Sequence, residues 1–106
     1  MPSVPRESAA IRVARALGDP NRFRLLKLIV ARDEVSCVEL TALLRLAQAT
    51  VSHHLKVLSD AGLVSVRKEG AFHYYRFRPA VLAAHGAALS AAFTAPRRPL
   101  RAGRAP

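Results

Sequence analysis

Residues 49–64, "ATVSHHLKVLSDAGLV", contain the pattern that decides the fold. Val51, Leu55 and Leu58 recur at positions i, i+4 and i+7, which is the spacing of one face of an α-helix. Gly62 follows the last of them and can end the helix in the left-handed conformation. We therefore predict an amphipathic helix that buries one apolar stripe and exposes a polar face.

Three shorter helical segments precede this helix. They are "SAAIRVARALG" (8–18), which begins with a capping residue, "DPNRFRLLKLIV" (19–30), which has a proline in its first turn, and "VELTALLRL" (38–46). The mostly apolar run in the second segment predicts the centre of the core. Only a brief turn around Ala47 separates the third segment from the amphipathic helix, which is typical of a helix-turn-helix pair.

The hydrophobic period changes after this pair. Residues 63–77, "LVSVRKEGAFHYYRF", are rich in β-branched and aromatic residues, and Gly70 suits a turn in their middle. The segment therefore predicts a β-hairpin. Tyr74 and Tyr75 alternate across the second strand, so one packs inward, and we expect that one to be Tyr75.

Residues 79–93, "PAVLAAHGAALSAAF", predict a last helix that is almost without charge. Such an apolar helix needs a cover, most simply its copy in a dimer. The fold class is therefore mostly α with a β-hairpin wing: a winged helix-turn-helix in the order α-α-α-α-β-β-α, over residues 8–93. We expect residues 1–7 to form a flexible N-terminal arm and residues 94–106 a disordered basic tail.

Charge and composition narrow the function. The 106-residue chain has 17 Lys and Arg against 7 Asp and Glu, a formal net charge of +10, and all seven acids precede the arginine-rich last ten residues. A polyanion, double-stranded DNA first of all, is therefore the expected partner. No apolar run reaches the ~18 residues of a membrane helix, and a single cysteine forms no internal disulfide. We expect a soluble, cytoplasmic protein with no membrane partner.

The polar face of the amphipathic helix carries side chains that can read DNA. Gln binds adenine in a bidentate manner, Ser and Thr adapt to several base edges, and His or Lys reaches guanine or phosphate. Any exposed helix has a polar face, so the pattern indicates DNA only together with the charge and the hairpin. The predicted contacts are Gln48, Thr50, Ser52, His53 and Lys56. His54 lies at the edge of the apolar stripe, so we expect a hydrogen-bonded boundary position for it first and a base contact second.

Catalysis is not expected. Ser52 and His53 are sequence neighbours, so they point about 100° apart around a helix, and no acid is placed to orient the imidazole. The chain also lacks a glycine-rich phosphate loop. We predict neither an enzyme nor a cofactor.

Three blocks resemble the ArsR (ArsR/SmtB) family of bacterial transcriptional repressors: "ALGDPNRFRLLKLI" (16–29), "ATVSHHLKVLSDAGLV" and "KEGAFHYYRF" (68–77). The resemblance implies a homodimeric repressor whose first and last helices form the dimer interface and whose wing follows the DNA backbone or minor groove. Two-fold symmetry then implies an inverted-repeat operator. The implied interface residues are Ile11, Ala14, Leu17, Leu82, Leu89 and Phe93, and the implied wing contacts to phosphate are Arg67 and Lys68, with Arg76 a weaker candidate.

Many members of that family bind metal or metalloid ions, and two of their sites can be compared with this sequence. A Cys-x-Cys block of the family resembles "EVSCVEL" (34–40), but Ser36 and Val38 occupy the two cysteine positions. The other site uses Asp and His of the last helix, where this chain has His85 alone and no acid. We therefore predict no metal site, and the inducer is unknown.

Cys37 is the only cysteine of the chain, within "DEVSCVELTALL" (33–44). Ser36 followed by Glu39 predicts a capping box worth ~1 kcal/mol, with Cys37 as the first helical residue. The positive end of the helix dipole would stabilise a thiolate there, so a thiol-responsive or small-ligand-responsive regulator is an alternative function. A second alternative is a non-specific nucleic-acid-binding module that uses its basic arms.

Overall fold

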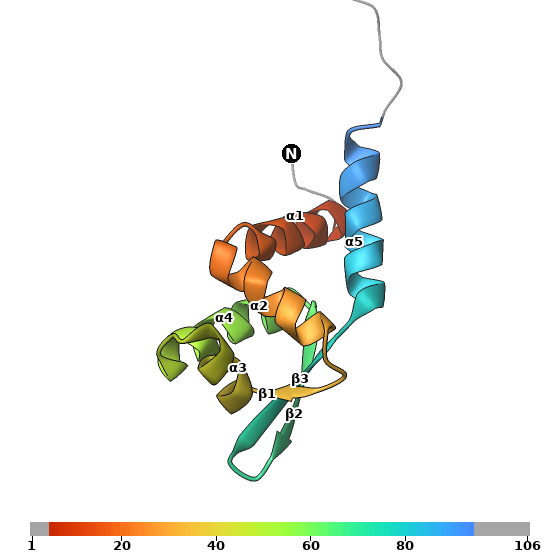
Figure 1. The fold of residues 1–106 in the computed structure, drawn as a ribbon. Coiled ribbons are helices and arrows are strands. Elements are labelled where there is room, and N and C mark those ends of the chain that lie inside the picture. The colour runs from red at the N-terminus through yellow and green to blue at the C-terminus, as the bar shows by residue number, and fades with distance from the viewer. Residues whose placement is uncertain (1–4, 95–106) are drawn as a thin grey trace, which may run out of the picture.

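The computed structural model describes residues 5–94, which form five helices and a three-stranded antiparallel sheet (Figure 1). The helices are α1 (Pro5–Leu17), α2 (Pro20–Val30), α3 (Cys37–Leu44), α4 (Gln48–Asp60) and α5 (Pro79–Ala92). The strands are β1 (Val35–Ser36), β2 (Val64–Glu69) and β3 (Phe72–Phe77), in the sheet order β1-β3-β2. The predicted winged helix-turn-helix is confirmed, with β1 as an additional strand.

Helix α1 begins earlier than the sequence predicts. Its first residue is Pro5, which is tolerated there because the first helical N–H groups have no partner within the helix. Residues 5–7 of the predicted arm therefore belong to α1, and residues 1–4 and 95–106 lie outside the described residues. The buried face of α1 carries Ala10, Val13 and Ala16.

Helix α2 has the predicted cap but a different exposure pattern. Asp19 Oδ1 accepts from the backbone N–H of Asn21 (2.8 Å) and of Arg22 (3.1 Å). Leucine and isoleucine side chains in the middle of α2 are buried, but Phe23 and Val30 are 53% and 51% exposed. The helix therefore lies in the core as predicted, through Leu25, Leu26 and Ile29, but its apolar residues Phe23 and Val30 point out of it.

Helix α3 begins with the predicted capping box. Ser36 Oγ accepts from the Glu39 backbone N–H at 3.1 Å, and Glu39 Oε1 accepts from the Ser36 backbone N–H at 3.3 Å. Cys37 is the first residue of the helix, as predicted. At its other end Arg45 adopts the left-handed conformation (φ 56°), which turns the chain sharply toward α4.

The hairpin and the added strand form the sheet. In the β2–β3 ladder Glu69 lies opposite Phe72, and Gly70 (φ 60°) occupies the turn between them. Tyr75 is buried, as expected. Strand β1 pairs with β3 on the side away from β2, with Val35 opposite Tyr75. The wing is thereby attached at its base to the start of α3.

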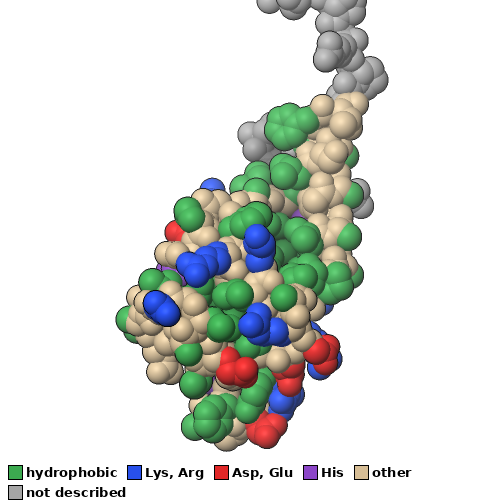
Figure 2. Space-filling model, in the orientation of Figure 1, with side chains coloured by type: hydrophobic (Ala, Val, Ile, Leu, Met, Phe, Trp, Pro, Cys, Tyr) green, Lys and Arg blue, Asp and Glu red, His purple; other side chains and the backbone are tan. Residues whose placement is uncertain are grey.

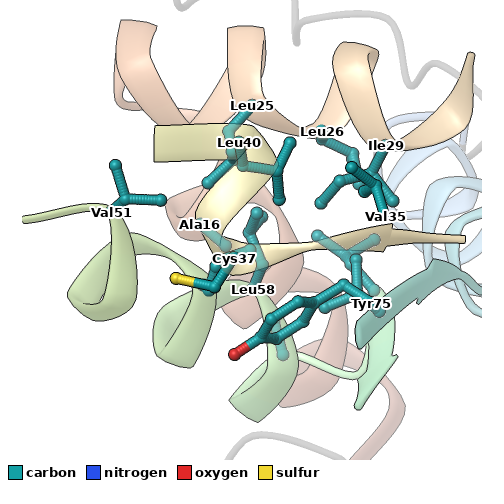
Figure 3. Packing of buried hydrophobic residues seen from close by; sticks show 14 of the residues in the cluster. Ala16, Leu25, Leu26, Ile29, Val35, Cys37, Leu40, Val51, Leu58 and Tyr75 are labelled. Carbon is teal, nitrogen blue, oxygen red and sulfur yellow. The ribbon is translucent and has the colours of Figure 1, made fainter. Parts of the chain in front are cut away.

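The core lies where the helices meet the sheet (Figure 3). Leu25 and Ile29 from α2, Leu40 from α3 and Leu58 from α4 belong to one buried cluster, together with Val35 of β1. Burial of each large apolar side chain contributes about 1.5–3 kcal/mol, so the apolar stripe of α4 is held firmly against α2 and α3. The polar face of α4 therefore points away from the core.

Helix α5 stands apart from this core and packs beside α1 (Figure 1). Ala88 is the only residue of α5 that is buried. Although α5 is apolar, no helix within residues 5–94 has both the length and the hydropathy needed to cross a membrane.

Candidate nucleic-acid interface

Helix α4 presents the predicted DNA-reading residues together on one exposed face. Val51, Leu55 and Leu58 are fully buried on its opposite face. All five predicted contacts are exposed: Gln48, Thr50, Ser52, His53 and Lys56. The N-cap residue, Ala47, makes no side-chain hydrogen bond to the first turn. The N-terminal N–H groups of α4 are therefore available to an anion such as a DNA phosphate.

Two of these exposed residues also contact neighbouring side chains. Lys56 Nζ lies 3.2 Å from Asp60 Oδ2 in a pair that is mostly exposed, so exchanging that partner for a phosphate costs little. Ser52 Oγ lies 3.9 Å from Cys37 Sγ at the start of α3. Ser52 is therefore exposed to solvent and also contacts helix α3 through its hydroxyl.

His54 occupies the boundary position that the sequence predicts. It is buried, and its Nδ1 lies 3.4 Å from Arg22 Nη1, while Arg22 Nε donates to the carbonyl of Ala16 at 2.7 Å. The backbone N–H of the same arginine is the main reason why the pKa of Asp19 lies below its ordinary value. Arg22 thus joins the end of α1, the start of α2 and α4, and His54 belongs to this junction rather than to the exposed face.

The two predicted wing contacts have different surroundings. Arg67 Nη2 and Nε donate to the two Glu34 carboxylate oxygens at 2.9 and 3.2 Å, and Nη1 pairs with Glu69. The guanidinium also lies 4.6 Å from the ring centroid of Tyr74. Hydrogen bonds to Glu34 and then Glu69 raise the pKa of Arg67, and the bond from Arg67 lowers the pKa of Glu34. The charge of Arg67 is largely compensated, whereas Lys68 is exposed and has no ion pair within residues 5–94.

Arg76, the weaker candidate, lies 3.7 Å from Asp33 with both side chains exposed. Both acid–arginine pairs join the segment before β1 to the strands of the wing. Sequence spacing could not reveal them, because Arg67 and Glu34 are 33 residues apart.

The tip of the wing lies close to the start of α4. A hollow of about 130 Å³ separates them, lined by Ser36, Cys37, Val38, Gln48, Ser52, Ala71, Phe72 and His73. Two exposed basic side chains that the sequence analysis did not select are near these elements: His73 lies opposite Lys68 in the ladder, and Arg45 ends α3. The register of β2 and β3 was needed to locate His73, and the conformation of the turn after α3 was needed to locate Arg45.

The residues predicted for a dimer interface lie on α1 and α5. Ile11, Leu89 and Phe93 are 48%, 39% and 84% exposed, Ala14 is exposed, and Leu17 and Leu82 are partly buried. Figure 2 shows hydrophobic side chains gathered over α5 and the adjoining parts of α1 and α2. The structure holds one chain, so the dimer interface stays a prediction.

Metal-ligating side chains do not gather in the described part of the chain. Within residues 5–94 no group of three or more His, Cys, Asp or Glu side chains is arranged to hold a metal ion. His85 Nδ1 is buried without a hydrogen-bond partner in the same range, and Cys37 is a buried free thiol.

Known proteins share this architecture. A family model described as a helix-turn-helix domain matches residues 17–67. The chain is 38% identical over 66 residues to an uncharacterised helix-turn-helix-type transcriptional regulator of Methanocaldococcus jannaschii, a match that covers 62% of this chain and 74% of that protein. It is 39% identical over 69 residues to the arsenic resistance transcriptional regulator ArsR1 of Pseudomonas putida, covering 65% of this chain and 54% of that protein. The chain thus spans about half the length of the second relative.

Solved structures extend the likeness to α5. A crystal structure described as a possible transcriptional regulator for arsenical resistance has a TM-score of 0.67 at 34% identity and covers 77% of this chain and 83% of that chain. The homodimeric winged helix-turn-helix DNA-binding domain of a Mycobacterium bovis protein has a TM-score of 0.65 and covers 95% of this chain and 97% of that chain. At 23% identity the second likeness shows the fold alone.

Proposed function

The chain belongs to the ArsR family of helix-turn-helix transcriptional regulators, and on that premise we propose that it is a sequence-specific repressor that binds an inverted-repeat operator as a homodimer. This family is a class of DNA-binding regulators and not a class of enzymes. The observation that carries the proposal is the exposed polar face of α4 beside the wing. A helix of this kind fits the major groove.

The exposed side chains divide by chemistry. Gln48 and His53, near the start of α4, are our base readers, with Thr50 and Ser52 as adaptable neighbours. Lys56 and Lys68 are our phosphate contacts, together with the N–H groups of the first turn of α4. Because Arg67 already has two carboxylate partners, we assign it to holding the wing in place.

In vitro selection of bound duplexes from a random pool tests sequence specificity directly. On the selected site, Gln48→Ala and His53→Ala should each cost about 1–3 kcal/mol, with little change on random DNA. Ser65→Ala, a change to an exposed polar residue of β2 to which neither a DNA contact nor a dimer contact is assigned, is the matched control and should leave both affinities unchanged. Equal losses on both kinds of DNA would remove Gln48 and His53 as base readers.

We further propose that the repressor does not sense metals through either of the two family sites considered above. The cysteine positions of one hold Ser36 and Val38, and the last helix supplies His85 as its only metal-ligating side chain within residues 79–92. The selected operator should stay bound when thiophilic or borderline metal ions are titrated into the complex. Release by such an ion at a stoichiometric concentration would contradict this part of the proposal.

One contact favours a second candidate function, a thiol-responsive repressor. Cys37 Sγ touches the Ser52 hydroxyl of α4, so oxidation of the thiol would place a bulkier polar group against the DNA-reading helix. Operator affinity should then fall after peroxide, recover with reductant and become insensitive to peroxide in Cys37→Ser. An unchanged affinity of the unsubstituted chain after peroxide would exclude the thiol as a switch.

A further inference from the structure

The guanidinium of Arg22 lies where α1, α2 and α4 pack against one another. Its Nε donates to the carbonyl of Ala16 at 2.7 Å and its Nη2 to the carbonyl of Arg15 at 3.4 Å. Its Nη1 lies 3.4 Å from Nδ1 of His54. The backbone of Arg22 is held as well, because its N–H donates to Asp19 Oδ1 at 3.1 Å. One side chain therefore contacts two helices besides its own.

The contacts of Arg22 with α1 have a clear physical reason. The last four carbonyl groups of a helix lack the usual donor one turn further on, and those of Arg15 and Ala16 are among them because α1 ends at Leu17. A cation at this end also interacts favourably with the helix dipole. The guanidinium is planar and its N–H groups form a rigid fork. Two bonds to α1 therefore fix the direction in which the remaining N–H groups point.

That direction is toward His54, which follows the proposed base reader His53 on α4. His54 is only 8% exposed, and a guanidinium donates hydrogen bonds but does not accept them. Nδ1 of His54 is therefore the acceptor, which leaves the ring proton of the neutral imidazole on Nε2. The contact thus selects one tautomer and one ring orientation for a buried side chain beside the DNA-reading face.

Polar contacts of this kind are few on α4. Within residues 5–94 only two polar side-chain contacts join α4 to another helix. One is the contact between Arg22 and His54, and the other joins Ser52 at 3.9 Å to the thiol of α3, which is a weak partner. The apolar stripe adds burial, which is favourable in any orientation, whereas a hydrogen bond requires alignment. The contact with Arg22 is therefore the strongest directional restraint on the rotation of α4 about its axis.

We propose that Arg22 is a positioning residue for DNA recognition, which acts through His54 to set the rotation of α4 and thereby the placement of the base readers. Side chains of a recognition site must lie within about 0.5 Å of their productive positions, and the sequence-independent attraction to phosphate needs no such precision. Loss of the contact therefore lowers affinity for the operator and leaves non-specific binding unchanged. The inference rests on the proposed sequence-specific binding and assigns a role in it to two residues outside the DNA-reading face.

Substitutions of His54 test the acceptor, with affinity measured on the selected operator and on random DNA. His54→Leu fills the buried site with an apolar side chain that has no acceptor, and it should weaken operator binding about tenfold with little change on random DNA. His54→Asn carries an acceptor oxygen on Cγ, where histidine carries Nδ1, and should restore operator binding to within about threefold of the unsubstituted chain. Equal losses for the two variants would overturn the proposal, because the acceptor would then be irrelevant.

Substitution of the arginine separates the contact from the loss of a charge. Arg24→Met is the matched control for Arg22→Met, because Arg24 is an exposed arginine of the same helix. Both should weaken binding to random DNA alike, but only Arg22→Met should lower the ratio of operator to random affinity, by about tenfold. This ratio is independent of the fraction of protein that is folded. Combined with His54→Leu, Arg22→Met should lower the ratio no further, and losses that add would overturn the coupling.

Nitrogen NMR of the imidazole gives a readout that does not depend on DNA. In the unsubstituted chain His54 should show a protonated Nε2 and an acceptor Nδ1, and Arg22→Met should shift the Nδ1 resonance whereas Arg24→Met should not. An arginine that only caps α1 would leave this resonance unchanged, and a proton on Nδ1 would overturn the assigned contact. A chain without preference for any selected site would overturn the proposed function itself. Operator preference that His54→Leu leaves unchanged would overturn the positioning role alone.

Discussion

Arg67 and Lys68 are neighbours on β2 with the same charge, but only Lys68 is free to take a new anion. Lys68→Ala should therefore weaken binding to operator and random DNA alike and reduce the slope of log K against log salt by about 1. Arg67→Ala should have a smaller effect on that slope, since its guanidinium is already shared between Glu34 and Glu69. DNA titrations at several salt concentrations measure both slopes. A larger slope change for Arg67 than for Lys68 would reverse the assignment.

Arg45 is the only residue other than glycine with a positive φ among the described residues. The left-handed conformation costs a residue with a side chain about 1–2 kcal/mol, and part of this is returned by the greater freedom of glycine in the unfolded chain. Arg45→Gly should therefore raise the free energy of unfolding by about 0.5–1 kcal/mol in urea denaturation. Arg24→Gly, a glycine placed inside α2, is the contrasting control and should lower it by about 1 kcal/mol. A loss of stability in Arg45→Gly would show that the arginine side chain makes a stabilising contact at the turn.

At the scale of elements, the attachment of the wing to the segment before β1 should depend on pH. The hydrogen bonds from Arg67 hold the pKa of Glu34 below its ordinary value of 4.5. A carboxylate with a lowered pKa stabilises the fold at pH values above its ordinary pKa, and this stabilisation is lost as the pH falls through the lowered value. Between pH 6 and pH 3 the melting temperature should therefore fall further in the unsubstituted chain than in Glu34→Gln.

Asp60→Asn provides the control for this measurement, because Asp60 is an exposed acid on α4 that pairs with Lys56 and not with a wing residue. Its melting curve should keep the full acid-induced decrease. Parallel pH profiles for Glu34→Gln and the unsubstituted chain would mean that the Glu34–Arg67 pair does not stabilise the fold.

Elements with a long repeating pattern were predictable from the sequence, and those set by distant contacts were not. The stripe of Val51 and Leu58, like the Ser36 capping box, is local information. Strand β1 has two residues and no period, so only its pairing with β3 defines it. The apolar spacing of α2 also could not distinguish residues covered by the same chain from Phe23, which the single chain leaves half exposed.

The candidate site shows the same division. The outward face of α4 follows from helical geometry, so the exposure of the five predicted DNA contacts was predictable once the buried stripe was known. The compensation of Arg67 by Glu34 was not, because folding alone brings β2 beside the segment that precedes β1. The sequence gives the number of cationic side chains, but only the fold shows which of them already have acidic partners.

For the whole molecule, the geometry of the proposed homodimer determines the spacing of the half-sites in the proposed operator. Helix α2 packs against both α1 and α4, so a dimer held through α1 and α5 would connect the α4 helices of its two copies through α2. The distance between the two α4 helices is then fixed, and a symmetric winged helix of this type places them about one turn of DNA, ~34 Å, apart. Inserting about five base pairs between the half-sites would rotate one half-site to the opposite face of the duplex.

Affinity for the operator with this insertion should therefore fall to that of a single isolated half-site, and the Gln48→Ala substitution should cost less on it than on the intact operator. Titration of intact, lengthened and half-site duplexes against the same protein measures this loss. A scrambled duplex of equal length corrects each value for the non-specific attraction of the +10 chain. An affinity that is independent of spacing would mean that each copy binds its half-site alone, because two helices held at a fixed separation cannot follow half-sites on opposite faces of the DNA.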